Sequence, residues 1–196
     1  GQYGHVIMDV TPMERGHGVT IENKVVGGNI PKEYIKPIEQ GIREAAQTGI
    51  LAGYPCIDFH VDILDGSYHP VDSSEMAFKI AASIAFKKCM EQANPILMEP
   101  VMNVEVTVPE DCLGDVMGDF NSRRGRIMGI DSEGKLQIVK AQCPLSEMFR
   151  YAIILRSMTS GRGTFSMEYS HYEEVPGDIA KKVIEQAAQE RKDEEE

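Results

Sequence analysis

Apolar and polar residues alternate over two short stretches near the start of the chain, residues 4–11 and 18–25, and such alternation is typical of β-strands. The glycine pair Gly27 and Gly28 ends the second stretch. Pro31 then suits the first position of a helix, and a run of apolar residues at helical spacing predicts its buried face before Gly49 and Gly53 end it. That face consists of Ile35, Ile38, Ile42 and Ala45.

The clearest strand follows at residues 57–63, with apolar and polar side chains on opposite faces. The apolar face holds Ile57, Phe59, Val61 and Ile63, and the polar face holds Asp58, His60 and Asp62. Asp72 and Glu75 stand three residues apart, which predicts a capping box at the start of a second helix running to about Gln92. Its expected buried face is Met76, Ile80 and Ile84. The stretch from Gly66 to Asp72 is therefore a turn between a strand and a helix.

The second half of the chain predicts the order strand, helix, strand, strand, helix, strand. The expected elements are a strand at 102–108, a helix from Leu113 that closes near Gly125, a hairpin with its turn at 131–134, a helix at 145–155 and a strand at 165–171. The second helix should bury Leu145, Met148, Ala152 and Leu155, and a phase slip between Ile138 and Val139 predicts a bulge. This βαββαβ order is the ferredoxin-like arrangement, and a further helix is expected from about Pro176. The fold class is α+β.

Charge and composition narrow the functional classes. The 196 residues carry a net charge of −11, which argues against a general nucleic-acid binder with a basic face. Residues 101–172 are nearly neutral, with nine acidic residues against eight basic ones, so any RNA contact must be local. No apolar stretch approaches the roughly 20 residues of a membrane span, and four widely spaced cysteines predict reduced thiols. We expect a soluble, cytoplasmic chain whose closing segment ERKDEEE is a solvated tail.

The residues that could carry catalysis or bind a metal are few. Asp58 and Asp62 would be about 13 Å apart on an ordinary strand, too far to share one ion, so a solvated sheet face is the simpler interpretation. His69 with Asp72 or Ser73 lacks the convergent groups of a hydrolytic site, and no phosphate-binding glycine motif occurs. For the arginines of the segment NSRRGR, stabilisation of a helix end and contact with phosphate both remain open.

Several long motifs, in order, resemble the carboxy-terminal part of bacterial elongation factor G, the ribosomal translocase. They are GQYGHV, VVGGNIPKEYI, GYPCIDFHVDILDGSYHPVDSSEMAFKIAAS, PVMNVEVTVPEDCLGDVMGDFNSRRGRIMGID and LSEMFRYAIILRSMTSGRGTFSMEYSHYEEVP. The resemblance implies that residues 1–99 are the fourth domain, with a fold like the second domain of ribosomal protein S5. It also implies that residues 100–175 are the fifth, ferredoxin-like domain, followed by a C-terminal helix and acidic tail at 176–196.

In that family the tip of the fourth domain enters the decoding centre and touches tRNA and mRNA. Carried over by position, the resemblance implies RNA-contacting tip loops formed by Val26, Gly27, Gly28, Asn29, Gly66, Ser67, Tyr68, His69, Pro70 and Asp72. It also implies contacts with large-subunit rRNA and the stalk base through Arg123, Arg124, Arg126 and Arg162. The expected function is thus to promote translocation of tRNA and mRNA on the ribosome. Unpaired RNA is gripped by ring stacking and close backbone approach, which tyrosine, histidine and glycine supply.

The resemblance also limits what this chain should do alone. It lacks the family's GTPase domain, so we expect no catalytic residue, metal or cofactor here, with GTP and magnesium serving the intact factor, and we expect a monomer. Pro70 stands where the family often has an acidic residue, which puts the tip geometry in question. Two alternatives remain: a ribosomal-protection or specialised elongation factor paralogue, and a small-molecule enzyme on an S5-like fold, which would need a nucleotide or metal pocket.

Overall fold

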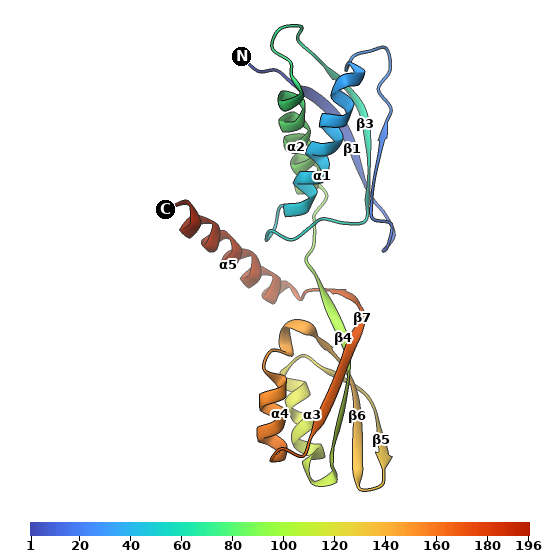
Figure 1. Ribbon diagram of the computed structural model, residues 1–196, viewed down its shortest axis with the longest axis vertical. Coiled ribbons are helices and arrows are strands. Elements are labelled where there is room, and N and C mark those ends of the chain that lie inside the picture. The colour runs from blue at the N-terminus through green and yellow to red at the C-terminus, as the bar shows by residue number, and fades with distance from the viewer. The chain divides into compact units, whose positions relative to one another are not determined.

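The computed structural model describes all 196 residues, and these divide into two compact units. Unit 1 comprises residues 1–96 together with 177–196, and unit 2 comprises residues 97–176 (Figure 1).

Unit 1 is a three-stranded sheet covered on one face by two helices (Figure 1). Its elements are β1 (His5–Pro12), β2 (Val19–Asn23), the 3₁₀ turn η1 (Lys32–Tyr34), α1 (Ile35–Thr48), β3 (Phe59–Ser67) and α2 (Glu75–Gln92). The sheet order is β1-β3-β2, with β3 antiparallel to β1 and parallel to β2. The parallel pair is joined through α1, the helical crossover that such a pair requires.

The core of unit 1 lies between the sheet and the helices. Phe59, Val61 and Ile63 of β3 are buried against Ile38 and Ile42 of α1, as the alternating pattern predicted. Because successive strand residues point to opposite faces, the residues between them on β3 lie on the uncovered face of the sheet.

Three predictions for unit 1 are wrong in detail. Met76, Ile80 and Ile84 are 46–55% exposed, because the larger rings of Phe78 and Phe86 occupy the core and turn the other face of α2 to solvent. The helix is capped by Ser74, whose side chain accepts a hydrogen bond from the Ala77 amide at 3.0 Å, and not by Asp72.

The third correction concerns the start of β3. Ile57 lies outside the strand and is exposed, because Asp58 adopts a positive φ of 60° and turns the chain. Asp58 Oδ1 accepts a hydrogen bond from the Gly18 amide at 2.9 Å. Asp58 therefore braces the neighbouring loop and does not share a strand face with His60 and Asp62.

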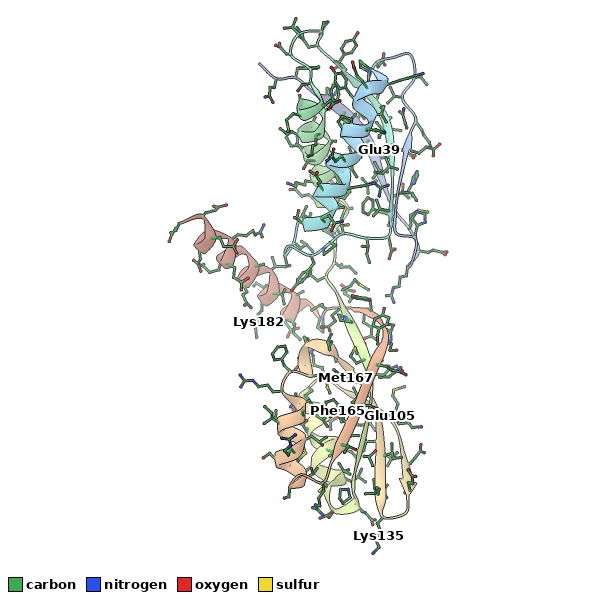
Figure 2. The ribbon with its side chains drawn as sticks, in the orientation of Figure 1. Glu39, Glu105, Lys135, Phe165, Met167 and Lys182 are labelled. Carbon is green, nitrogen blue, oxygen red and sulfur yellow. The ribbon has the colours of Figure 1, made fainter.

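Unit 2 confirms the predicted βαββαβ order. Its elements are β4 (Met98–Pro109), η2 (Glu110–Cys112), α3 (Leu113–Ser122), β5 (Arg126–Glu133), β6 (Leu136–Pro144), η3 (Leu145–Glu147), α4 (Tyr151–Thr159) and β7 (Thr164–Glu174). The sheet is antiparallel in the order β5-β6-β4-β7, and the helix α5 (Gly177–Glu195), whose residues are grouped with unit 1, follows β7. Figure 2 shows Lys135 at the end of the β5–β6 hairpin.

An aromatic cluster forms much of the core of unit 2. The ring of Tyr151 in α4 stacks on Phe120 of α3 at 5.6 Å and meets the edge of Phe165 of β7 at 5.0 Å. Phe165 is labelled in Figure 2. Val104, Val106 and Val108 of β4, which were predicted to share one face, are buried against these helices.

The local predictions for unit 2 need three corrections. The hairpin turn lies at 134–135, later than predicted, and the bulge lies at Met128 in β5 and not between Ile138 and Val139. The helix begins only at Tyr151, because the positive φ of Arg150 separates it from η3. Leu145 and Ala152 are consequently exposed. Nowhere in the chain is a helix both long and apolar enough to cross a membrane.

Candidate functional site

The two loops expected at the tip of unit 1 do meet at one end of its sheet. Asn29 Nδ2 donates a hydrogen bond to Asp65 Oδ1 at 2.8 Å, which links the 26–29 segment to the end of β3. Beneath this link Ile30 packs over Gly66, which is buried. A methyl group at Gly66 would lie 2.6 Å from Ile30 Cδ1 and would overlap the carbonyl oxygen of His5. The absence of a side chain at Gly66 thus brings the two loops together.

The 26–29 loop is a tight turn built on two glycines. Gly27 and Gly28 have φ values of 69° and 71°, in the left-handed region that residues with a Cβ avoid. Val26 beside them is 75% exposed. This loop therefore offers bare backbone and one apolar side chain to a partner.

The turn after β3 is organised by His69. Its backbone amide donates to Ser73 Oγ at 2.8 Å, and its ring Nδ1 accepts from the amides of Val71 and Asp72 at 3.2 and 3.1 Å. Ser73 Oγ in turn donates to the Tyr3 carbonyl at 2.8 Å, so its proton is committed to a structural bond. The arrangement holds no activated nucleophile, and it directs the Nε2 edge of the His69 ring away from the turn.

The amino-terminal segment is a third component of this end of the unit, and the sequence analysis missed it. The Tyr3 amide donates to the Asp72 carbonyl at 2.9 Å, and the Tyr3 and Ser67 hydroxyls are hydrogen-bonded at 2.6 Å. Ser67 Oγ also lies 2.9 Å from His5 Nδ1. These contacts join residues more than 60 positions apart, so no local pattern could have revealed them. They place Ser67 in the support of the tip.

The exposed part of the tip is apolar and aromatic. Tyr68 is 46% exposed, Val71 is 83% exposed, and Pro70 lies between them. Asp65, near the end of β3, accepts hydrogen bonds from Asn29 and from the Gly66 backbone, and these lower the pKa of its carboxyl group below the ordinary value. The tip therefore presents rings and backbone beside fixed negative charge, with no basic side chain other than His69 among 26–29 and 66–72.

In unit 2 the first two arginines of the NSRRGR segment are bound within the domain. Arg123 donates to Asp119 Oδ2 at 2.7 Å and to the Glu147 carbonyl at 2.5 Å, and its guanidinium lies 5.1 Å from the centre of the Tyr151 ring. Arg124 donates to both carboxylate oxygens of Glu99 and to Glu147 Oε1 at 3.0 Å.

These bonds bear on the two interpretations left open for the pair. Hydrogen bonding to Glu99 and Glu147 raises the pKa of the Arg124 guanidinium, and the Arg123 side chain is only 12% exposed. Both guanidinium groups are already engaged inside the domain, so the arrangement favours a structural role for both over contact with phosphate.

The other two predicted arginines are better placed for an external contact. Arg126 and Arg162 are 59% and 50% exposed, and each pairs with one exposed carboxylate, Glu173 and Asp111 respectively. Arg150 and Arg156, which were not among the predicted contacts, are exposed and form no ion pair, and Phe149, the neighbour of Arg150 in the sequence, is 82% exposed. Exposed arginines without an ion pair are a signal that only the structure reveals.

Comparison with known proteins accounts for both units. Residues 1–94 match the family model described as elongation factor G, domain IV, and residues 96–183 match the model for the elongation factor G C-terminus. The chain belongs to the elongation factor G family. Unit 1 is thus built on domain IV, and unit 2 on the C-terminal domain.

One solved structure resembles almost the whole chain. A crystal structure of a protein from Thermus thermophilus is 44% identical in sequence and superimposes with a TM-score of 0.79. The match covers 96% of this chain but only 28% of the Thermus chain. This chain therefore spans just over a quarter of the length of that relative.

Proposed function

We propose that this chain is the ribosome-engaging part of a translocase, and that the tip of its domain IV contacts tRNA and mRNA during their movement through the small subunit. The observation that carries the proposal is the joined pair of loops at one end of domain IV, with Tyr68 and His69 exposed on one loop and the backbone of Gly27 and Gly28 on the other. Family membership supports it, because translocation is the work of elongation factor G.

The chemistry of the tip fits unpaired RNA. Exposed rings stack on bases without regard to sequence, and bare glycine backbone permits close approach. The acidic surroundings disfavour non-specific binding along a phosphate backbone, because there is little positive charge to release counterions. We infer that the tip interacts through stacking and shape and only slightly through charge.

We assign the C-terminal domain to the large subunit, with Arg126 and Arg162 as candidate contacts with rRNA near the stalk base. Arg150 and Phe149 at the start of α4, and Arg156 in its last turn, are further exposed candidates. GTP and Mg²⁺ would serve a separate GTPase domain of the whole factor, and we expect this chain to bind neither as a cofactor.

The decisive experiment uses an elongation factor G whose carboxy-terminal part is this chain. Tyr68→Ala removes an exposed tip ring, and Tyr54→Ala is the matched control, since Tyr54 is 62% exposed near the opposite end of β3. A stacked ring contributes about 1–3 kcal/mol, so Tyr68→Ala should slow single-round mRNA movement by about fivefold to a hundredfold. Ribosome-stimulated GTP hydrolysis should hardly change, and Tyr54→Ala should match wild type in both assays.

Three outcomes would contradict the proposal or redirect it. Unchanged movement in Tyr68→Ala would remove this ring from the site. Loss of GTP hydrolysis together with movement would indicate failed ribosome binding. Rescue of tetracycline-inhibited ribosomes without mRNA movement would identify a ribosomal-protection paralogue in place of a translocase.

A further inference from the structure

The uncovered face of the domain IV sheet carries three carboxylates in one row. Asp62 of β3 is the register partner of Asp9 on β1 and of Glu22 on β2, so all three side chains project from the same face. Like charges directly opposite on neighbouring strands destabilise a sheet unless a cation lies between them. Such a row needs positive charge.

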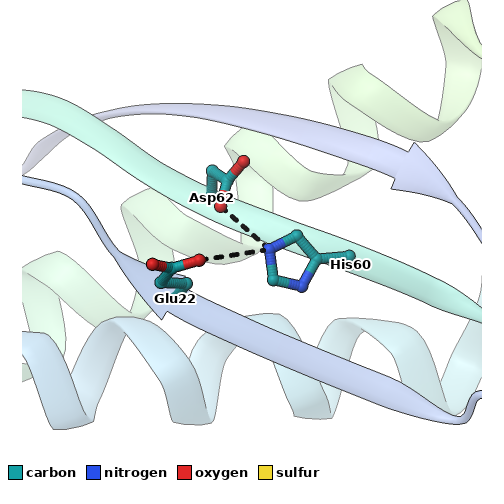
Figure 3. A group of neighbouring side chains, drawn as sticks. All are labelled: Glu22, His60 and Asp62. Carbon is teal, nitrogen blue, oxygen red and sulfur yellow. Dashed lines mark hydrogen bonds and ion pairs between the residues drawn. The ribbon is translucent and has the colours of Figure 1, made fainter.

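His60 lies beside this row, two residues before Asp62 on the same face of β3 (Figure 3). Its Nε2 is 2.9 Å from Asp62 Oδ1 and 3.8 Å from Glu22 Oε2. The three ligand atoms, one from each residue, all lie within 4.8 Å of one another. One imidazole nitrogen and two carboxylate oxygens thus lie close together on this face.

The other side of the His60 ring is held as metal-binding histidines are held. Its Nδ1 is 2.6 Å from Thr20 Oγ1, and Thr20 Oγ1 is 2.7 Å from His17 Nε2. When Thr20 donates to His17, His60 Nδ1 must donate to Thr20, and the lone pair of Nε2 then faces the two carboxylates. If the Thr20 hydroxyl donates to His60 Nδ1 instead, the proton of the neutral His60 ring lies on Nε2. A support of this kind fixes the orientation of a ligating ring.

We propose that Glu22, His60 and Asp62 form a binding site for a divalent cation of the zinc class. Ligand atoms about 2.0–2.1 Å from a tetrahedral ion lie about 3.3 Å apart, and the two distances from Nε2 bracket that value. The Glu22 side chain is 59% exposed, so it can move to shorten the longer distance, 3.8 Å. Water completes the coordination. The nitrogen ligand and the small carboxylate count favour Zn²⁺ over Mg²⁺ or Ca²⁺, which prefer oxygen ligands only.

Lys24 modulates the site without occupying it. Its Nζ is 3.3 Å from Asp62 Oδ2, the oxygen that does not face His60, so Lys24 does not occupy Oδ1, the oxygen that faces Nε2. The positive charge of Lys24 neutralises part of the carboxylate row and opposes a second cation nearby. Removing that charge should therefore strengthen metal binding.

A bound ion would connect the two strands that lead to the tip loops. Glu22 stands one residue before the end of β2, which leads to the 26–29 loop, and β3 continues to the turn at 68–72. The ion would add a cross-strand tie at the base of both loops. This consequence rests on the proposed function of the tip, but the metal site itself does not.

Calorimetric titration of the metal-free chain with ZnCl₂ tests the site. Wild type should give a saturable one-to-one isotherm that millimolar MgCl₂ does not abolish. His60→Ala and Glu22→Gln should each weaken affinity at least about tenfold, because even supporting residues of metal sites contribute that much. Lys24→Met should tighten binding by roughly threefold or more, the effect of one unit charge a few ångströms away.

The matched control is His171→Ala. His171 Nε2 lies 2.7 Å from Glu173 Oε1 but is not part of a three-ligand group, so this variant should bind Zn²⁺ as wild type does. Glu22 is exposed, so Glu22→Gln tests the site even if His60→Ala fails to fold. Absence of saturable binding, or equal binding by wild type and Glu22→Gln, would overturn the proposal. Weakening in His171→Ala equal to that in His60→Ala would also overturn it.

Discussion

At the scale of single residues, His69 has two roles, one at the surface of the tip and one within the turn. Its exposed ring is available to stack on a partner, and the Nδ1 atom of the same ring accepts two backbone amides of the turn. A substitution at His69 therefore changes both the surface and the order of the loop. The two effects can be measured independently, because an asparagine side chain supplies a comparable acceptor without a ring.

We expect His69→Ala to lower the free energy of unfolding by about 1 kcal/mol, because two amides lose their acceptor and water replaces it only in part. His69→Asn should recover most of that loss, while both variants slow mRNA movement in the full factor because both lack the ring. Urea denaturation of the chain gives the stabilities. Equal destabilisation by alanine and asparagine would show that the Nδ1 contacts do not order the turn.

At the scale of elements, the sequence predicted the order and type of almost every helix and strand, because hydrophobic periodicity reports directly which side of an element is buried. It failed on α2, where both Met76, Ile80 and Ile84 and the alternative face with Phe78 and Phe86 have helical spacing. Only tertiary packing selects between two apolar faces, and the larger rings fill the core. Local positive φ values, as at Asp58 and Arg150, also left no pattern to detect.

The candidate site was likewise only partly predictable from the sequence. The loops themselves were found through resemblance to a family, but the contacts that hold them together join residues far apart in the sequence. Tyr3 and His5 meet Ser67 across more than 60 positions, and Glu22 reaches His60 only because β2 pairs in parallel with β3. Such pairs depend on strand register, which composition and spacing in one sequence do not specify.

The hydrogen bond between Asn29 and Asp65 gives this end of domain IV a dependence on pH. The pKa of Asp65 is lowered in the folded state by Asn29 and by the Gly66 amide, so the link stabilises the loops above the ordinary Asp pKa of about 3.9. That contribution is lost as pH falls through the lower folded value. We expect Asn29→Ala to raise the pKa of Asp65 toward the ordinary value.

Carboxyl ¹³C NMR titration of Asp65 measures this shift directly. Glu173 offers a control in the other unit, since its partners are His171 and Arg126 and the substitution should leave its lowered pKa unchanged. An Asp65 pKa that is the same in wild type and Asn29→Ala would show that the side-chain bond does not couple the two loops.

At the scale of the whole molecule, the arrangement of charge limits how the chain can attract RNA. The net charge is −11, and Arg123 and Arg124 are paired with carboxylates inside the C-terminal domain. Electrostatic attraction to rRNA therefore depends on a few exposed guanidinium groups. Ribosome binding should be weakly dependent on salt, with a slope set by the number of those groups that meet phosphate.

The dependence of ribosome binding on salt distinguishes arginines that contact phosphate, as expected for Arg126 and Arg162, from an arginine with a structural role, as expected for Arg124. Replacing Arg126 and Arg162 by glutamine removes two exposed charges whose surface ion pairs contribute little stability, so folding should be nearly unchanged. If both meet phosphate, the slope of log K against log salt for ribosome binding should flatten by roughly 0.7–0.9 for each.

Arg124→Gln should leave the slope unchanged but lower the free energy of unfolding by about 2 kcal/mol, because it leaves Glu99 and Glu147 partly buried without their partner. Binding measured by sedimentation over a range of KCl concentrations, beside denaturation of each variant, separates the two roles. A flattened slope in folded Arg124→Gln would show that this guanidinium leaves its carboxylates to reach the ribosome, and an unchanged slope in the double variant would exclude Arg126 and Arg162 from the phosphate contacts.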